Sequence, residues 1–180
     1  MIDIKLLEQL CLCNGISGDE VNVRNLIINE IKDCADDIKT DNLGNLIVFK
    51  KGKKSAKSKL MVSAHMDEVG LMVTDITSDG YLKFDEVGGI DRRVLPGKRV
   101  CVGRNGLNGV IGVKPIHLTN SDEKTAVPKM NDMYIDIGAE SREDALKYVN
   151  YGDGINFEGG FKINGKTVVT KAVSYTHLTL

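Results

Sequence analysis

The sequence predicts an α/β opening followed by a β-rich module. Two stretches with helical apolar periodicity, residues 4–13 and 18–31, precede most of the strand patterns. Past Leu60, short β-type runs alternate with turns rich in Gly, Pro, Asn and Asp. Strands at such short spacing are typical of a small sandwich or barrel, whereas the first seventy residues have an α/β pattern.

Capping residues define the two opening helices. Asp3 is a good N-cap for the first helix, and Asn14-Gly15 provides a stop signal for it. Ser17 and Glu20 match the S-x-x-E capping box and predict the start of the second helix. The apolar face of this helix is formed by Val23, Leu26, Ile27 and Ile31.

Strands are predicted on both sides of residue 60. "DIKTD" and "NLIVFK" flank the turn residues 42–45, and "KKGKKSAKSK" is a charged loop. A short helix, "SREDALKYV", starts at Ser141 with Asp144 in the capping position. The later strands are predicted at "LMVSA", "GLMVTDI", "YLKFDE", "KRVCVG", "GVIGVK", "MYIDIG", "GINFE" and "KTVVT".

Composition restricts the class of protein and its partners. With 180 residues and 42% apolar side chains, the chain can form one domain or two small ones. A formal net charge of −1 gives no nucleic-acid footprint and no polybasic membrane surface, and no apolar run is long enough to span a bilayer. The N-terminus is a poor secretion signal. Cys11, Cys13, Cys34 and Cys101 lack C-x-x-C spacing, so we expect reduced, mostly core thiols and a cytoplasmic location.

The stretch "KLMVSAHMDEVGLMV" carries His65 and Asp67 two residues apart. A strand places such residues on the same side, so the two can face one pocket. A metal-bound imidazole usually donates its other ring N–H to a carboxylate, so Asp67 could orient His65 or could be a ligand itself. The alternative is an ordinary strand end with exposed acids. One His alone cannot hold a catalytic metal.

No second ligand is obvious in the sequence. We expect a structural role for His117, in "KPIHL", and His177 lies in the terminal tail. The other acids form no paired-acid motif, and they are scattered as Asp75, Asp79, Asp85, Glu86, Asp91, Asp136, Asp153 and Glu158.

Five separated blocks give the sequence a specific resemblance. They are "SAHMDEVGLMV", "GGIDRRVLPGKRV", "GVIGVKPIHL", "YIDIGAESREDA" and the "GD" at residues 152–153. In this order they resemble the glutamyl aminopeptidase family of co-catalytic metallopeptidases, some of whose members carry endoglucanase labels. The resemblance runs from about Ile4 to Ala172.

The resemblance implies a partial α/β/α aminopeptidase catalytic domain with an inserted β-barrel-like domain. Residues 1–70 would open the catalytic domain, and residues 71–165 would form the insert, which takes part in homo-oligomer assembly. Residues 166–172 would be a strand that returns to the catalytic sheet.

The resemblance also implies a site and its chemistry. His65 would bind one of two divalent metal ions, zinc or cobalt, and Asp67 would be the acid that orients it. A metal-activated water would attack the first peptide bond of a peptide substrate, with a glutamate as general base.

The sequence departs from the family pattern after "TVVTKA". The family continues with a leucine and an Asp-Asp-Arg turn that supplies a bridging aspartate. Residues 173–180 instead read "VSYTHLTL", which resembles a translated sequencing adapter, so we expect this tail to be non-native. We therefore expect an N-terminal fragment that binds metal at most weakly and is inactive and poorly soluble. The alternatives are a noncatalytic assembly or binding module and a glycoside hydrolase. The second is disfavoured because the chain has no Trp and only 5% aromatic residues.

Overall fold

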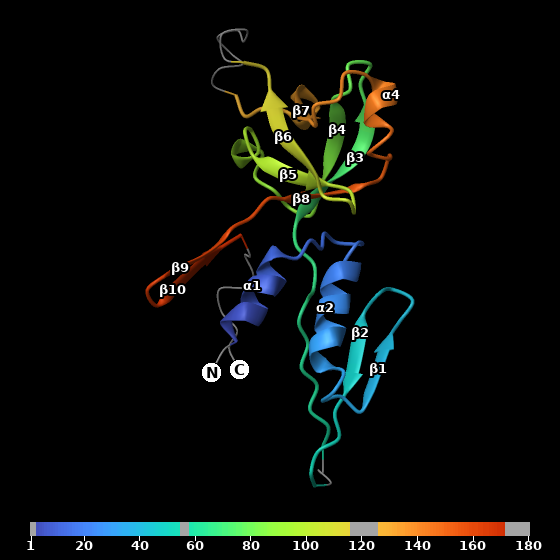
Figure 1. Cartoon of the computed structure of the whole chain (residues 1–180), viewed down its shortest axis with the longest axis vertical. Helices are drawn as coiled ribbons and strands as arrows, with labels where there is room; N and C mark the ends of the chain where they lie inside the picture. The colour runs from blue at the N-terminus through green and yellow to red at the C-terminus, as the bar shows by residue number, and fades with distance from the viewer. Residues whose placement is uncertain (1–2, 55–57, 116–125, 172–180) are drawn as a thin grey trace. The chain divides into compact units, whose positions relative to one another are not determined.

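A computed structural model describes residues 3–54, 58–115 and 126–171 (Figure 1). The chain divides into two compact units, unit 1 with residues 1–68 and 161–180, and unit 2 with residues 69–160. His117, His177, most of the predicted loop at residues 119–129 and the tail at residues 173–180 lie outside the described residues.

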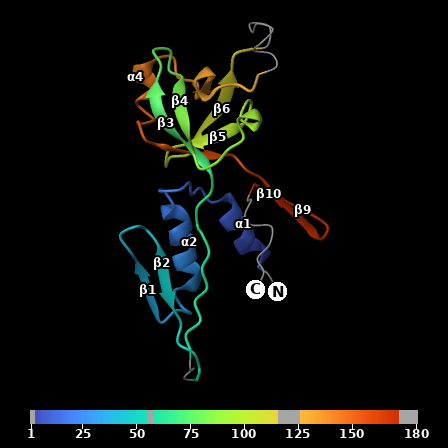
Figure 2. The same cartoon turned by 180° about the vertical axis from the view of Figure 1, so that it is seen from behind.

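Unit 1 contains two helices and two separate antiparallel hairpins. Its elements are α1 (Ile4–Leu12), α2 (Val21–Ile31), β1 (Asp37–Thr40), β2 (Leu46–Phe49), β9 (Phe161–Asn164) and β10 (Thr167–Thr170). Figures 1 and 2 show α2 beside the β1–β2 hairpin. Arg24 on α2 donates from Nη1 to the carbonyl of Gly44, 3.0 Å away, which ties the helix to the hairpin turn.

The predicted cap of α1 is confirmed and that of α2 is wrong. The Asp3 carboxylate accepts hydrogen bonds from the backbone N–H groups of Lys5 and Leu6, at 2.9 and 3.2 Å. By contrast, α2 has no side-chain cap, and the Ser17 hydroxyl donates to the Asp67 carboxylate. An ionised acceptor forms a stronger hydrogen bond than a neutral one. The Ser17 hydroxyl therefore binds the Asp67 carboxylate, 50 residues away, and does not cap α2 as the capping-box pattern predicts.

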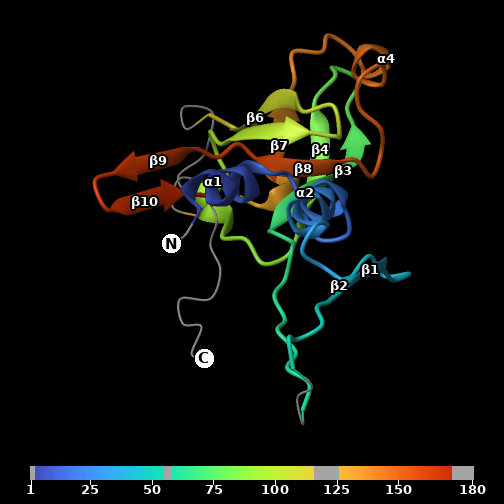
Figure 3. The ribbon, with the colours of Figure 1, turned by 60° about the horizontal axis from the view of Figure 1, so that its bottom comes forward.

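The strand predicted at "LMVSA" is not formed. Residues 59–67 belong to no strand, and the side chains of Leu60, Met61 and Val62 are 91%, 88% and 83% exposed. A strand needs a partner for its backbone N–H and C=O groups, and in the described part of the chain none pairs with this run. The sequence also missed β9, which pairs with β10 from Thr167↔Asn164 to Thr170↔Phe161 (Figure 3).

Unit 2 is a closed antiparallel barrel with the strand order β3-β4-β7-β6-β5-β8 (Figure 1). Its strands are β3 (Gly70–Ile76), β4 (Leu82–Val87), β5 (Arg99–Val102), β6 (Leu107–Val113), β7 (Met133–Asp136) and β8 (Gly154–Phe157). The pairing of β3 with β8, Leu71↔Ile155 and Met72↔Gly154, closes the barrel. This decides between the predicted alternatives of sandwich and barrel.

The barrel interior holds the main core of the chain. Alternate strand residues such as Leu71 and Val73 on β3, or Met133 and Ile135 on β7, are at most 1% exposed. The remaining elements of unit 2 are short: η1 (Arg92–Val94), η3 (Met130–Asp132) and α4 (Arg142–Ala145). The Ser141 cap of α4 is confirmed, because its side chain accepts from the backbone N–H of Asp144 at 3.2 Å. Every helix in the described ranges is too short or too polar to cross a membrane.

The four cysteines are free thiols with unequal exposure. Cys11 is buried and Cys34 is exposed, while Cys13 and Cys101 are intermediate, so the expectation of mostly core thiols holds only for Cys11. Burial raises the pKa of the Cys13 thiol above its usual value, and the nearby Lys171 ammonium partly offsets this. A raised pKa lowers the fraction of reactive thiolate.

Thiol alkylation should follow this order of exposure. At neutral pH we expect Cys34 to react with iodoacetamide first and Cys11 only after unfolding, with Cys13 slow because its thiol stays protonated. Mass spectrometry of peptides from timed samples measures each rate. Cys34→Ser should remove the fast phase, and fast labelling of Cys11 in the folded protein would contradict the described packing of α1.

Candidate functional site

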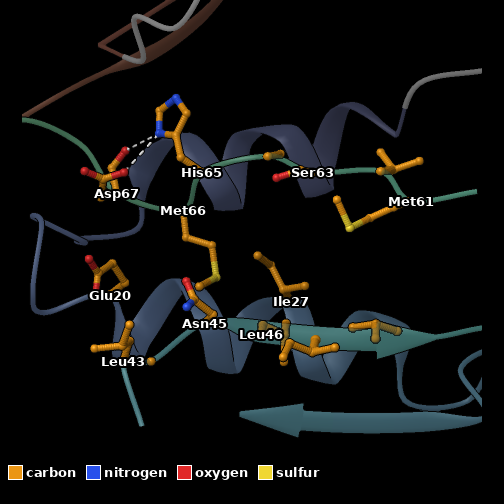
Figure 4. A pocket seen from close by; sticks show the side chains of 15 residues that line it. Glu20, Ile27, Leu43, Asn45, Leu46, Met61, Ser63, His65, Met66 and Asp67 are labelled. Atoms are coloured by element: carbon orange, nitrogen blue, oxygen red, sulfur yellow. Dashed lines mark hydrogen bonds and ion pairs between the residues drawn. The ribbon is translucent and has the colours of Figure 1, made fainter. Parts of the chain in front are cut away.

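His65 and Asp67 lie together in unit 1, on the segment that follows the charged loop (Figure 4). The Nδ1 atom of His65 is 3.0 Å from the backbone carbonyl oxygen of Asp67 and 3.1 Å from its carboxylate Oδ1. Both oxygens are acceptors, so Nδ1 carries the proton and donates to them. In this tautomer the neutral ring has its lone pair on Nε2, the atom that would coordinate a metal.

Asp67 is held by a second partner. The hydroxyl of Ser17 donates to Oδ2 of Asp67, the carboxylate oxygen other than the one nearest His65. This hydrogen bond is the largest influence that lowers the pKa of the Asp67 carboxyl, and the hydrogen bond from His65 lowers it further. The side chains of His65 and Asp67 are 47% and 38% exposed, so a ligand in solution can reach the pair.

Backbone contacts fix the loop that carries Ser17. Ile16 is buried and forms an isolated parallel bridge with Glu68, whose backbone N–H donates to the Gly15 carbonyl at 2.8 Å. A Cβ atom at Gly15 would lie 2.6 Å from Cγ2 of Val23 on α2, so only glycine allows the loop this close to the helix. These contacts fix which residues of the loop lie opposite the segment that carries His65.

Two hollows in unit 1 border the pair. The larger has a volume of about 550 Å³ and lies between α2, β2 and residues 61–67 (Figure 4). The smaller, of about 350 Å³, lies between α1, α2 and residues 64–68. His65, Met66 and Asp67 line both hollows. The segment thus forms a wall with open space on either side.

Comparison with known proteins identifies the family. The sequence model of the M42 glutamyl aminopeptidases matches residues 44–174, a range that includes His65 and Asp67. This chain belongs to the M42 family. The M42 chain is 47% identical over 168 residues to a putative aminopeptidase of Acetivibrio thermocellus, covering 93% of this chain and 48% of the relative. It is 30% identical over 176 residues to the glutamyl aminopeptidase of Lactococcus lactis, covering 94% and 49%.

Solved structures of similar proteins share the fold of this chain. The TET aminopeptidase of the marine sediment archaeon Thaumarchaeota archaeon SCGC AB-539-E09 superposes with a TM-score of 0.83 at 34% identity, over 89% of this chain and 45% of that one. Pyrococcus horikoshii TET1, described as able to assemble into a tetrahedron or a large octahedral shell, gives 0.79 at 45% identity, over 92% and 49%. An endoglucanase of Thermotoga maritima gives 0.79 at 41%, over 90% and 47%. The M42 chain thus spans about half the length of these proteins.

The described residues of the M42 chain fit one part of a metal site. An exposed imidazole with its Nδ1–H held by a carboxylate is the usual arrangement of a metal ligand and the group that orients it. Within the described ranges, however, no three His, Cys, Asp or Glu side chains are grouped so that they could hold an ion. Catalytic zinc commonly uses three protein ligands. The described side chains could therefore supply only part of such a ligand set.

Several acids that the sequence left open form ion pairs in unit 2. Arginine partners lie 2.5 to 3.7 Å from their carboxylates, in the pairs Asp91–Arg93, Arg99–Glu158, Arg92–Glu86 and Arg142–Asp75. Hydrogen bonds from Arg93 lower the pKa of the Asp91 carboxyl to about 2. These four acids thus have local partners.

Sequence reasoning missed two polar contacts near the pair. Ser17 matches a helix-capping pattern, and Lys171, which directly follows β10, belongs to no motif. Lys171 donates from Nζ to Oε1 of Glu68 at 2.7 Å, and the two side chains are only 12% and 29% exposed. Burial raises the pKa of the Glu68 carboxyl, while the Lys171 ammonium opposes the rise. Neither contact has a local motif, because the partners are 50 and 103 residues apart.

Lys171→Met should destabilise unit 1 in a pH-dependent way. A raised folded-state pKa means that ionising Glu68 weakens the fold as pH rises, and loss of the ammonium enlarges this effect. We expect a loss of about 1–3 kcal/mol at neutral pH. The loss should vanish below the ordinary glutamate range of about 4 to 5, where Glu68 is protonated.

Far-UV circular dichroism during urea unfolding at several pH values measures this loss, because α1 and α2 supply most of the described helix. Glu68→Gln combined with Lys171→Met is the control, since it leaves no charge to bury. A loss of the same size at acidic and neutral pH would count against the ion pair as its cause.

Proposed function

We propose that this chain is part of a metal-dependent aminopeptidase that removes N-terminal residues from peptides. The observation that carries the proposal is the hydrogen bond from His65 Nδ1 to Asp67 in a chain of the M42 family. His65 would bind one of two divalent ions, zinc or cobalt, through Nε2. When bound, such ions lower the pKa of a water and polarise a substrate carbonyl.

Asp67 has a positioning role in this proposal. By accepting from Nδ1–H, it keeps the imidazole in the tautomer that coordinates through Nε2 and makes the ring a stronger donor to a metal. The lowered pKa of its carboxyl keeps Asp67 ionised, and therefore an acceptor, at neutral pH. The partial exposure of both side chains gives a peptide access to the pair.

In this proposal the rest of the donor set would lie in the half of its relatives that this chain does not span. With one imidazole ligand, we expect the chain as printed to bind zinc or cobalt at most weakly and to be inactive. In the full-length enzyme, an aspartate that bridges the ions and a glutamate base would complete the site.

A domain arrangement accompanies this function. Residues 1–70 and 166–172 would belong to an α/β/α catalytic domain, and residues 71–165 would be an insert that takes part in homo-oligomer assembly. The closed barrel of unit 2 and the shells formed by the P. horikoshii relative support the second part. The exposed apolar run at residues 60–62 supports the first, because such side chains are normally covered in a sheet. A cytoplasmic location fits the four free thiols.

The native gene provides the first test. An Asp-Asp-Arg turn followed by a Glu-Glu pair beyond codon 172 would support the enzyme. The full-length protein should then hydrolyse aminoacyl p-nitroanilides with a free amino group but not their N-acetylated forms. Chelation should abolish this activity, and zinc or cobalt should restore it. Hydrolysis that survives chelation or accepts N-acetylated substrates equally well would overturn the proposal.

A noncatalytic assembly module is the second candidate. It is favoured by an intact barrel and by the absence of a grouped ligand set among the described residues. An uninterrupted native reading frame without the acidic motifs would support it. The endoglucanase name of the T. maritima relative is tested in the same assay series with carboxymethylcellulose, where we expect no hydrolysis.

A further inference from the structure

We infer that Ser17 is a positioning residue for His65 and acts through the carboxylate of Asp67. The inference deepens the proposed function and rests on it, since the role of His65 as a metal ligand is part of that proposal. The three residues form a hydrogen-bonded chain in which Ser17 and His65 donate to different oxygens of the same carboxylate.

The two hydrogen bonds together fix the orientation of the Asp67 carboxylate. Oδ2 accepts from the Ser17 hydroxyl, and Oδ1 lies 3.1 Å from Nδ1 of His65. The terminal torsion of an aspartate is broad, so a carboxylate with a single partner can rotate away from it. With both oxygens engaged, the plane of the carboxylate is set, and it holds the proton of His65 on Nδ1.

Backbone contacts on both sides of Ser17 hold its hydroxyl near the Asp67 carboxylate. The buried Ile16 is paired with Glu68, and the Gly15 carbonyl accepts from the Glu68 N–H at 2.8 Å, so the residues before Ser17 are fixed to those after Asp67. On the other side, the Gly18 N–H donates to the Glu20 carboxylate at 2.7 Å. Ser17 thus projects from a loop held at both ends.

The hydroxyl has no competing structural role in the helix. Although the sequence matches a capping box, α2 begins at Val21 and receives no side-chain cap from Ser17. Removing the hydroxyl therefore leaves the helix end as it is, while Asp67 loses the partner of Oδ2. The backbone carbonyl of Asp67, 3.0 Å from Nδ1, remains as a second acceptor for His65. The effect on His65 should accordingly be partial.

The test reads the tautomer of His65 directly. Long-range ¹H–¹⁵N correlation spectra of the metal-free chain, at a pH where imidazole is neutral, distinguish a protonated Nδ1 from a protonated Nε2. We expect the wild type to hold the proton on Nδ1 and Ser17→Ala to show a clear increase in the Nε2–H form. Ser17→Thr keeps a hydroxyl and should restore the wild-type spectrum. Ser58→Ala, at another exposed serine, should leave it unchanged.

A second measurement separates this inference from the proposed function. In the full-length enzyme, Ser17→Ala should weaken zinc or cobalt affinity about tenfold, as loss of groups that orient a ligand does. Activity should return at excess metal with KM unchanged. An unshifted His65 tautomer in Ser17→Ala overturns the inference whatever the metal affinity. A shifted tautomer with unchanged metal affinity supports the positioning role and counts against His65 as a ligand. If Ser17→Ala does not fold, the test uses Asp67→Asn with Ser17 intact, which should shift the His65 tautomer. An unshifted tautomer in that variant would show that these hydrogen bonds do not set the tautomer of His65, and it would overturn the inference.

Discussion

Replacing His65 by alanine should reduce the aminopeptidase activity of the full-length enzyme on the order of 1000-fold. A catalytic metal contributes several kcal/mol of transition-state stabilisation, and each step of about 1.4 kcal/mol changes the rate tenfold. Under the proposed function, loss of the imidazole removes one metal ligand, and it leaves the Asp67 carboxylate without its Nδ1–H donor. The rate constant kcat/KM for an aminoacyl p-nitroanilide, measured at several metal concentrations, is the readout.

His117→Ala is the matched control for this variant, because His117 is predicted to be structural and its loss also removes one imidazole. We expect it to keep activity within a few-fold of wild type. Asp67→Asn should fall between the two, with a loss of about 10- to 100-fold in metal affinity or activity. Wild-type activity in His65→Ala would show that the imidazole binds no essential metal.

Replacing Ile135 by alanine should destabilise the barrel by about 2–5 kcal/mol, the cost of a cavity in a packed core. Ile135 on β7 is 0% exposed and pairs with Leu82 on β4 and Ile111 on β6, so its side chain contacts the core where three strands meet. Urea unfolding followed by tyrosine fluorescence measures the loss. The chain has no Trp, and four of its five tyrosines lie in unit 2, so this signal reports the barrel.

Val110→Thr is the control for the barrel. Val110 lies on β6 and is 45% exposed, and threonine keeps the branched Cβ that strands favour, so we expect a change of about 0.5 kcal/mol or less. A loss below about 1 kcal/mol in Ile135→Ala would contradict a packed interior at this position.

Much of the fold follows from local patterns. The sequence correctly predicts the Asp3 cap, the Ser141 cap and the hairpin of β1 with β2. In each of these features the interacting residues are close to each other in the chain. The strands of the barrel were also expected, because alternation and turn residues are local signals. Local strand and turn patterns left the choice between a barrel and a sandwich open, and only the family resemblance implied a barrel-like insert. The choice depends on β3 meeting β8 about eighty residues later, and both architectures use the same alternation.

For the candidate site, too, the sequence supplied the local pattern and the tertiary structure supplied the distant contacts. The sequence by itself determined that His65 and Asp67 are two residues apart, and together with the family blocks this made them the candidate pair. Only the tertiary structure decided which atoms meet, and it brought Ser17 to Asp67 and Lys171 to Glu68. The physical reason is that a hydroxyl or an ammonium takes the best acceptor in space. Periodicity and capping rules describe only the acceptors nearby in the chain.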